Sequence, residues 1–101
     1  MVESIYRITE DFPSKENFGI ISQMRRAAVS VPANIAEGYG RQSTGSYSQF
    51  LSVARGSLYE LETQIEICIR LKYIHKIESE SLLAEIVEIS KMISSLISKL
   101  H

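Results

Sequence analysis

The sequence predicts an all-α protein that folds as an antiparallel, up-down four-helix bundle in a single domain over residues 1–101. Three observations lead to this fold class. Apolar residues recur at alternating intervals of three and four through three long segments, which is the spacing of an amphipathic helix. Pro13, Gly40 and Gly45 lie outside those segments, where a helix can end. The apolar content is mostly aliphatic and contains no tryptophan, which favours helices over a sheet.

The first helix is expected over residues 2–11. Its apolar residues at helical spacing are Val2, Ile5, Tyr6 and Ile8. Pro13 ends this helix, because the residue before a proline is disfavoured in the α region. Ser14 is the expected N-cap of the second helix, since a serine side chain accepts hydrogen bonds from free N–H groups in a first helical turn.

The second helix is expected from about residue 15 to residue 39, and its stripe continues in phase through Pro32. The stripe consists of Ile21, Met24, Ala28, Val31 and Ile35. This register predicts a kinked but continuous helix, because a helix that ended at Pro32 would not keep its stripe in phase beyond it. Pro32 leaves the carbonyl of Ala28 without its helical donor. We expect Asn34, or a side chain from a neighbouring helix, to satisfy the disturbed backbone.

A turn over residues 41–45 separates the second helix from the third. Gly38 and Gly40 are expected to end the second helix, since glycine is common at helix C-termini. Ser43, Thr44 and Ser46 can each cap the third helix, and Ser46 with Gln49 three residues later has the pattern of a capping box.

The third and fourth helices carry the longest apolar stripes. The third contains Tyr47, Leu51, Ala54, Leu58, Leu61, Ile65 and Cys68, and the fourth contains Leu82, Ile86, Ile89, Ile93, Leu96 and Leu100. Gly56 inside the third helix predicts a close helix crossing there. The third helix is expected to end at residues 72–76, and the fourth to begin near Glu78. A second apolar row widens the fourth helix: Leu83, Val87, Met92 and Ile97. A face this wide predicts burial against another copy of the chain.

Residue types that carry catalysis are scarce. His75 and His101 have no cysteine, aspartate or glutamate at ligand spacing, so no metal site is expected. Cys68 lies on the apolar stripe, where a buried inert thiol is the ordinary case. The glycines near residue 40 lack the Gly-Lys-Ser/Thr of a phosphate loop. The sequence therefore predicts no enzyme, no cofactor and no small-molecule substrate. The single cysteine excludes an internal disulfide, and no apolar run reaches the ~18–20 residues of a membrane span, so a cytoplasmic location is expected.

Positive charge is concentrated in the middle of the chain. Between Ile20 and Tyr59 the only anion is Glu37, so this segment carries +3 and the remainder −4, which gives the net charge of −1. The cations of the segment are all arginines: Arg25, Arg26, Arg41 and Arg55. The planar arginine fork suits phosphates and carboxylates, so these residues are candidate contacts to nucleic acid or to a partner. The alternative is that they pair with Glu37, Glu60 or Glu62 across the bundle.

Pro32, Asn34, Glu37 and Gly38 form a second candidate group. Asn34 and Glu37 can serve as contact residues in a groove. They can also form a polar network that holds the helix against Arg25, Arg26 or a neighbouring helix, because buried polar groups need partners. The sequence favours this structural role over binding for the whole group.

Two blocks of the sequence carry a family resemblance. The pattern S-x-P-x-N-I-A-E-G begins at Ser30, and A-R-G-S-L-x-E-L-E-T-Q begins at Ala54. From about Ile5 to Leu100 the chain resembles the bacterial 23S rRNA-intervening-sequence protein family. The resemblance implies a four-helix bundle that assembles as a ring-like homopentamer. Family members usually begin a few helical turns further upstream, so a short or trimmed first helix is expected here.

A related branch of the family is the accessory protein of diversity-generating retroelements, which binds a reverse transcriptase and nucleic acid through a basic surface. By resemblance, the partners are another copy of the chain and either RNA or a reverse-transcriptase-like protein. The leading hypothesis is a non-enzymatic, self-assembling scaffold that binds RNA or a nucleic-acid enzyme. The alternative is a purely structural or protein-interaction module that binds no nucleic acid.

Overall fold

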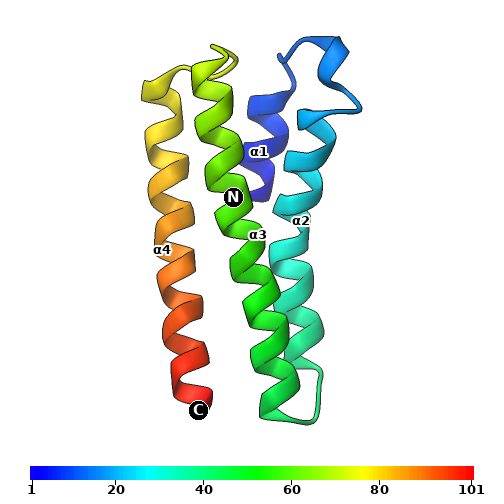
Figure 1. Ribbon diagram of the computed structural model, residues 1–101, viewed down its shortest axis with the longest axis vertical. Helices are drawn as coiled ribbons and strands as arrows, with labels where there is room; N and C mark the ends of the chain where they lie inside the picture. Colours follow the sequence, from blue (N-terminus) through cyan, green and yellow to red (C-terminus); the bar gives the residue numbers. More distant parts are fainter.

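The computed structural model describes residues 1–101 and contains helices and no strand (Figure 1). The elements are α1 (Val2–Thr9), a 3-10 helix η1 (Ser14–Glu16), α2 (Ile20–Tyr39), α3 (Thr44–Arg70) and α4 (Lys76–Leu100). Successive α helices run in alternating directions, and the molecule measures 43 × 25 × 18 Å. The predicted all-α four-helix fold is therefore confirmed.

The four helices differ in how much of the bundle they cover. The largest helix interface joins α2 to α3, and the next joins α3 to α4. The short α1 packs on α2 and lies beside only one half of the long helices (Figure 1). The amino group of Met1 lies 3.1 Å from Oε1 of Glu85, and this ion pair links the start of α1 to α4.

The core follows the predicted stripes. The fully buried large side chains include Ile5, Met24, Leu51, Leu58, Leu61, Ile65 and Ile86. Each of the four helices contributes at least one of them, so α1 belongs to the same core as the long helices. The second apolar row of α4 is less buried than the stripes. Leu83 and Ile97 are half-buried, whereas Val87 and Met92 are exposed.

The ends of the helices differ from the predictions. Ser14 does not cap α2, because residues 14–16 form the 3-10 helix and α2 begins only after Gly19. Of the three candidate caps of α3, Ser43 is the one used, since its Oγ accepts a hydrogen bond of 3.1 Å from the N–H of Ser46, and the capping box expected at Ser46 does not form. Several serines and a threonine compete as caps in this stretch, and pattern alone does not rank them.

The first helix ends at Thr9 rather than at residue 11, and α3 ends at Arg70 rather than at residues 72–76. The fourth helix begins at Lys76, two residues before the predicted start. Glu78 lies in the first turn of α4, where its carboxylate accepts a hydrogen bond of 2.9 Å from the backbone N–H of His75.

Helix α2 runs without interruption through Pro32, which confirms the predicted continuity. Asn34, however, does not reach the carbonyl of Ala28. Its amide donates to the carbonyl oxygen and the hydroxyl of Ser30, at 2.7 and 2.9 Å. The expectation for Ala28 is wrong because a side chain bent back along its own helix meets the carbonyl four residues earlier, and for Asn34 that residue is Ser30.

The close crossing predicted at Gly56 is also wrong, since a Cβ added there would meet no atom within 4 Å. The close crossing occurs at Gly38, where a Cβ would lie 2.6 Å from the Cβ of Phe50. Gly38 is buried inside α2, and Gly40 is the residue that caps its C-terminus.

Candidate functional site

The four candidate arginines do not gather in one patch. Arg25 and Arg26 lie in the first half of α2, Arg41 lies in the turn after it, and Arg55 lies in α3. A helix rises 1.5 Å per residue, so Arg26 and Arg41 are separated by roughly 20 Å along α2. The structure brings together only Arg25 and Arg26.

Arg25 fastens α2 to α1. Its Nε donates to the hydroxyl of Thr9 at 2.9 Å, and its Nη2 donates to the carbonyl of Tyr6 at 3.3 Å. The guanidinium also lies over the ring of Tyr6, 4.7 Å from the ring centroid. The side chain is half-buried and has no carboxylate within salt-bridge distance. The Arg25 guanidinium is therefore held by neutral groups, and no acidic side chain neutralises its positive charge.

Arg26 is exposed, and its Nη2 donates to the hydroxyl of Ser22 at 2.9 Å. Arg25 and Arg26 together line a shallow depression of about 460 Å³ between α1 and the start of α2. We call this depression the arginine hollow, and it is lined by Tyr6, Asn17, Ile21, Ser22, Arg25, Arg26 and Val29.

Arg41 makes the local ion pair that the alternative interpretation predicted, although not across the bundle. Its Nη2 lies 2.6 Å from Oε1 of Glu37, one turn earlier, and both side chains are exposed. Its guanidinium also lies 5.0 Å from the ring centroid of Phe50. Glu37 therefore neutralises Arg41 and does not contact Arg25 or Arg26.

Arg55 is half-buried between α3 and α4, where its Nη1 donates to the hydroxyl of Ser94 at 3.1 Å. It forms no salt bridge with Glu37, Glu60 or Glu62. Its guanidinium serves mainly to join two helices.

Asn34 belongs to a polar network that joins α2 to α3. The hydroxyl of Ser30 accepts from Asn34 at 2.9 Å and from the hydroxyl of Ser57 at 2.9 Å. The sequence favoured a structural role for Asn34 against Arg25, Arg26 or a neighbouring helix. In the structure Asn34 bonds to Ser30 of its own helix, and Ser30 makes the contact with α3. Sequence reasoning missed Ser30 and Ser57, although each lies within one of the two blocks that carry the family resemblance.

The groups with chemical reactivity do not converge. Cys68 is buried, and burial raises the pKa of its thiol to about 11, with a smaller contribution from the negative charge of Glu16. The ring of His101 shares a hydrogen bond of 2.9 Å with the hydroxyl of Ser48, which lies at the opposite end of α3 from Cys68. No group of three or more histidine, cysteine, aspartate or glutamate side chains is arranged to hold a metal ion.

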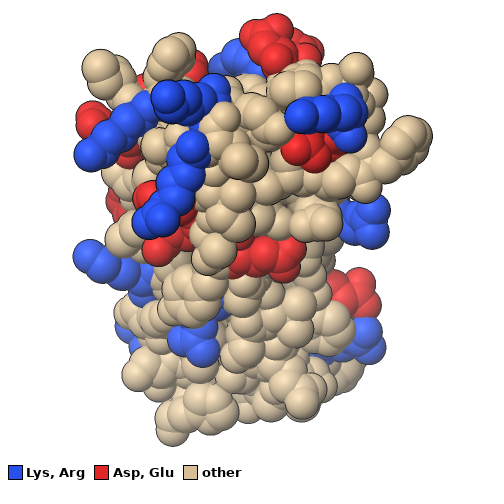
Figure 2. All heavy atoms as spheres, turned by 45° about the horizontal axis from the view of Figure 1, so that its top comes forward, with Lys and Arg blue, Asp and Glu red and all other residues tan.

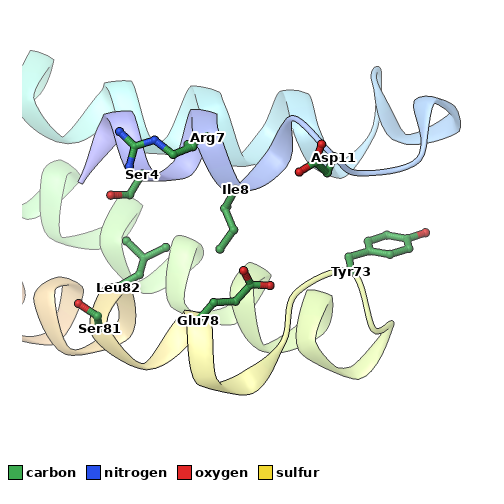
Figure 3. A pocket seen from close by; sticks show the side chains of 8 residues that line it. All are labelled: Ser4, Arg7, Ile8, Asp11, Tyr73, Glu78, Ser81 and Leu82. Atoms are coloured by element: carbon green, nitrogen blue, oxygen red, sulfur yellow. The ribbon is translucent and has the colours of Figure 1, made fainter.

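A polar depression of about 390 Å³ lies between α1 and α4 (Figure 3). Ile8 and Glu78 point into it from opposite sides, whereas the ring of Tyr73 points away. The hydroxyl of Tyr73 donates to Glu16 at 2.8 Å, and this hydrogen bond is the main cause that raises the Tyr73 pKa. No sequence pattern indicates this depression, because its lining comes from two helix ends and a loop. Its charged groups do not aim at one point, so it has no catalytic arrangement.

The charged side chains are mixed over one end of the molecule and sparser over the rest of the same view (Figure 2). The face drawn in Figure 2 therefore shows no broad patch of one sign. None of the helices combines the length and the apolarity needed to cross a bilayer.

Comparison with known proteins agrees with the fold and the sequence blocks. A solved structure from Bacteroides thetaiotaomicron VPI-5482, described as a protein with unknown function from the S23 ribosomal protein family, superposes with a TM-score of 0.84 at 28% identity. The match covers 95% of this chain and 87% of that one. A search of curated proteins finds no match. The model of the 23S rRNA-intervening sequence protein family matches residues 1–95, and the chain therefore belongs to that family.

Proposed function

We propose that this protein is a non-enzymatic scaffold that assembles with copies of itself and binds RNA or an enzyme that acts on nucleic acid. The observation that carries the self-assembly is a surface of α4, beside α3, on which exposed apolar side chains lie among charged ones. Two adjoining depressions of about 290 and 400 Å³ share Val87 and Lys91. Tyr59 and Val87 are 51% and 39% exposed there, and Leu83 and Ala84 extend the apolar area.

Exposed apolar side chains that gather on one face and are bordered by polar residues commonly mark an interaction site. A ring-like homopentamer requires two different surfaces on each protomer, because its contacts are heterologous. Phe18, which is 99% exposed in the loop before α2, supplies an apolar projection on another part of the molecule. We propose Phe18 as part of the second surface.

Light scattering tests the assembly. The wild-type protein should have a mass of about five times 11.4 kDa, and Val87→Glu should lower it by placing a charge in the contact. Val53→Glu is the matched control, since Val53 is also an exposed valine in a long helix but lines neither depression. A monomeric wild type, or a mass that falls equally in both variants, would contradict the proposal.

The RNA role rests on the arginines. Adding structured ribosomal RNA at low and moderate salt should produce a complex that weakens as salt rises, because arginine–phosphate contacts release counterions. Alanine at all four positions (Arg25, Arg26, Arg41 and Arg55) should weaken that binding and flatten its salt dependence. Unchanged affinity would remove the RNA surface.

The second candidate function is a protein-interaction module without nucleic acid. It is favoured by the engagement of Arg25 with α1, of Arg41 with Glu37 and of Arg55 with Ser94. Under this function the four-alanine variant loses stability or changes its mass, while the wild type ignores RNA at every salt concentration.

A further inference from the structure

We infer that the arginine hollow binds a phosphate group of RNA. This inference deepens the proposed RNA role and rests on it. It also divides the four candidate arginines, since it assigns the contact to Arg25 and Arg26 and leaves Arg41 and Arg55 as structural residues.

The charge of the hollow distinguishes it from four other depressions of the surface. It is lined by two arginines and by no acidic side chain. Each of those four contains a cation together with at least one carboxylate: Arg7 with Asp11 and Glu78, Arg26 with Glu60, Lys91 with Glu62, and Lys91 with Glu88. The arginine hollow therefore has an excess of positive charge that no lining residue balances, although the chain as a whole has a net charge of −1.

Arg25 is held in place before any ligand arrives. A guanidinium has five N–H donors. Two of those on Arg25 are directed to Thr9 and to the carbonyl of Tyr6, which leaves three for a ligand. The ring of Tyr6 further restricts the guanidinium plane. A ligand that binds Arg25 thus avoids much of the entropy cost of ordering a long side chain.

Arg26 and the first turn of α2 supply further donors. Arg26 uses one N–H on Ser22 and is otherwise exposed. Ile21 and Ser22 also line the hollow, and their backbone N–H groups, which belong to the first turn of α2, make no backbone hydrogen bond. Arginine forks donate two parallel hydrogen bonds to phosphate oxygens, so two neighbouring arginines suit this ligand.

The rim of the hollow is apolar. Tyr6 and Val29 are both exposed and lie on its two walls, one from α1 and one from α2. A phosphate held by Arg25 and Arg26 places the attached sugar and base against these side chains. This arrangement favours a nucleotide chain over a carboxylate from another protein, because a ribose or base can cover the tyrosine edge and the valine.

The first experiment titrates inorganic phosphate into the full chain labelled with ¹⁵N and follows the arginine Nε–H signals by NMR. The signals of Arg25 and Arg26 should shift and saturate, while those of Arg41, Arg55 and Arg70 should not. Sodium chloride at the same ionic strength is the control. Equal shifts of all the arginine signals, or shifts that never saturate, would overturn the inference.

The second experiment measures binding of a single-stranded RNA oligonucleotide to Arg26→Glu and to Arg70→Glu. Both residues are exposed and the two variants change the net charge equally, so the fold should survive in each, as circular dichroism will show. Arg26→Glu should reduce the affinity at least about tenfold. Its plot of log affinity against log salt should become shallower by about 0.7 for each phosphate that the variant no longer neutralises.

Equal weakening by the two variants would overturn the inference and leave the RNA role standing. If the arginine signals shift and saturate with inorganic phosphate but the protein does not bind RNA, the hollow binds phosphate from another source. That result would overturn both the inference and the proposed RNA role. A reduced RNA affinity in Arg26→Glu alone supports both.

Discussion

Gly38 of α2 lies so close to Phe50 of α3 that a methyl group on Gly38 would be 2.6 Å from the Cβ of Phe50. The added atom would also lie 3.1 Å from the ring of Tyr47. The two helices can therefore meet at this level only because residue 38 has no side chain. The crossing brings the last turn of α2 against the first turns of α3, next to the loop that joins them.

Gly38→Ala should lower the free energy of unfolding by about 1–3 kcal/mol, because overpacking forces the two backbones apart. Gly56→Ala is the matched control, since a Cβ at position 56 meets nothing within 4 Å. That variant should be neutral or stabilising by up to about 1 kcal/mol, because alanine favours the helix. Urea denaturation measures both, and equal effects of the two substitutions would show that the crossing is not close in solution.

Pro32→Ala should raise the free energy of unfolding. Pro32 is exposed in the interior of α2, so its replacement restores an N–H donor for the carbonyl of Ala28 without opening a cavity. The gain should be about 2 kcal/mol. Alanine is favoured over proline inside a helix by about 3 kcal/mol. The greater conformational entropy of the unfolded alanine variant offsets up to about 1 kcal/mol of this. Thermal unfolding measures the gain. A loss of stability, or a changed mass in solution, would mean that the shape imposed by Pro32 is needed for packing or assembly.

Tyr73 should make stability depend on alkaline pH. Its hydrogen bond to the Glu16 carboxylate raises the Tyr73 pKa above the ordinary value of 10.0. The unfolded chain therefore loses this proton at lower pH than the folded chain does. The stabilisation is complete below pH 10 and is lost as the pH rises through the folded pKa. Chemical denaturation between pH 8 and pH 11 should show a steeper decline for the wild type than for Tyr73→Phe, and identical slopes would contradict the prediction.

Cys68 should resist thiol reagents in the folded protein. Its pKa of about 11, raised mainly by burial, leaves almost no thiolate at neutral pH, and the side chain is inaccessible. Mass spectrometry after treatment with iodoacetamide should find the native chain unmodified and the urea-unfolded chain modified. Rapid labelling without denaturant would show that the bundle opens often around α3.

The long helices were predictable because their stripes keep one register over many turns, and stripe residues such as Leu58 and Ile65 are fully buried. The helix ends were less predictable because several neighbouring side chains compete for the same free N–H groups, as Ser43 and Ser46 do before α3. Gly56 and Gly38 are both single glycines in helical sequence. Only the three-dimensional structure shows that Gly38 lies at a close helix crossing and that Gly56 does not.

The candidate site shows the same limit. Charge placement identified all four arginines, but their separation depends on helix direction and on which face each side chain occupies. Arg25 faces α1 and Arg55 faces α4, which the spacing of arginines alone does not reveal. Arg41 pairs with Glu37, and the position of Glu37 one turn earlier in the sequence favours this pair.

The brevity of α1 has a consequence for how the molecule fluctuates. A helix of eight residues is marginally stable in isolation. The order of α1 therefore depends on its packing against the other helices through Ile5 and Thr9, and on the hydrogen bond from Arg25 to Thr9. We expect its free energy of opening to be smaller than that of the long helices, so its amides should exchange with deuterium first, as one cooperative unit. Each opening removes one wall of the arginine hollow and frees the Arg25 guanidinium. A ligand in that hollow therefore slows the exchange of α1 as well as filling a site.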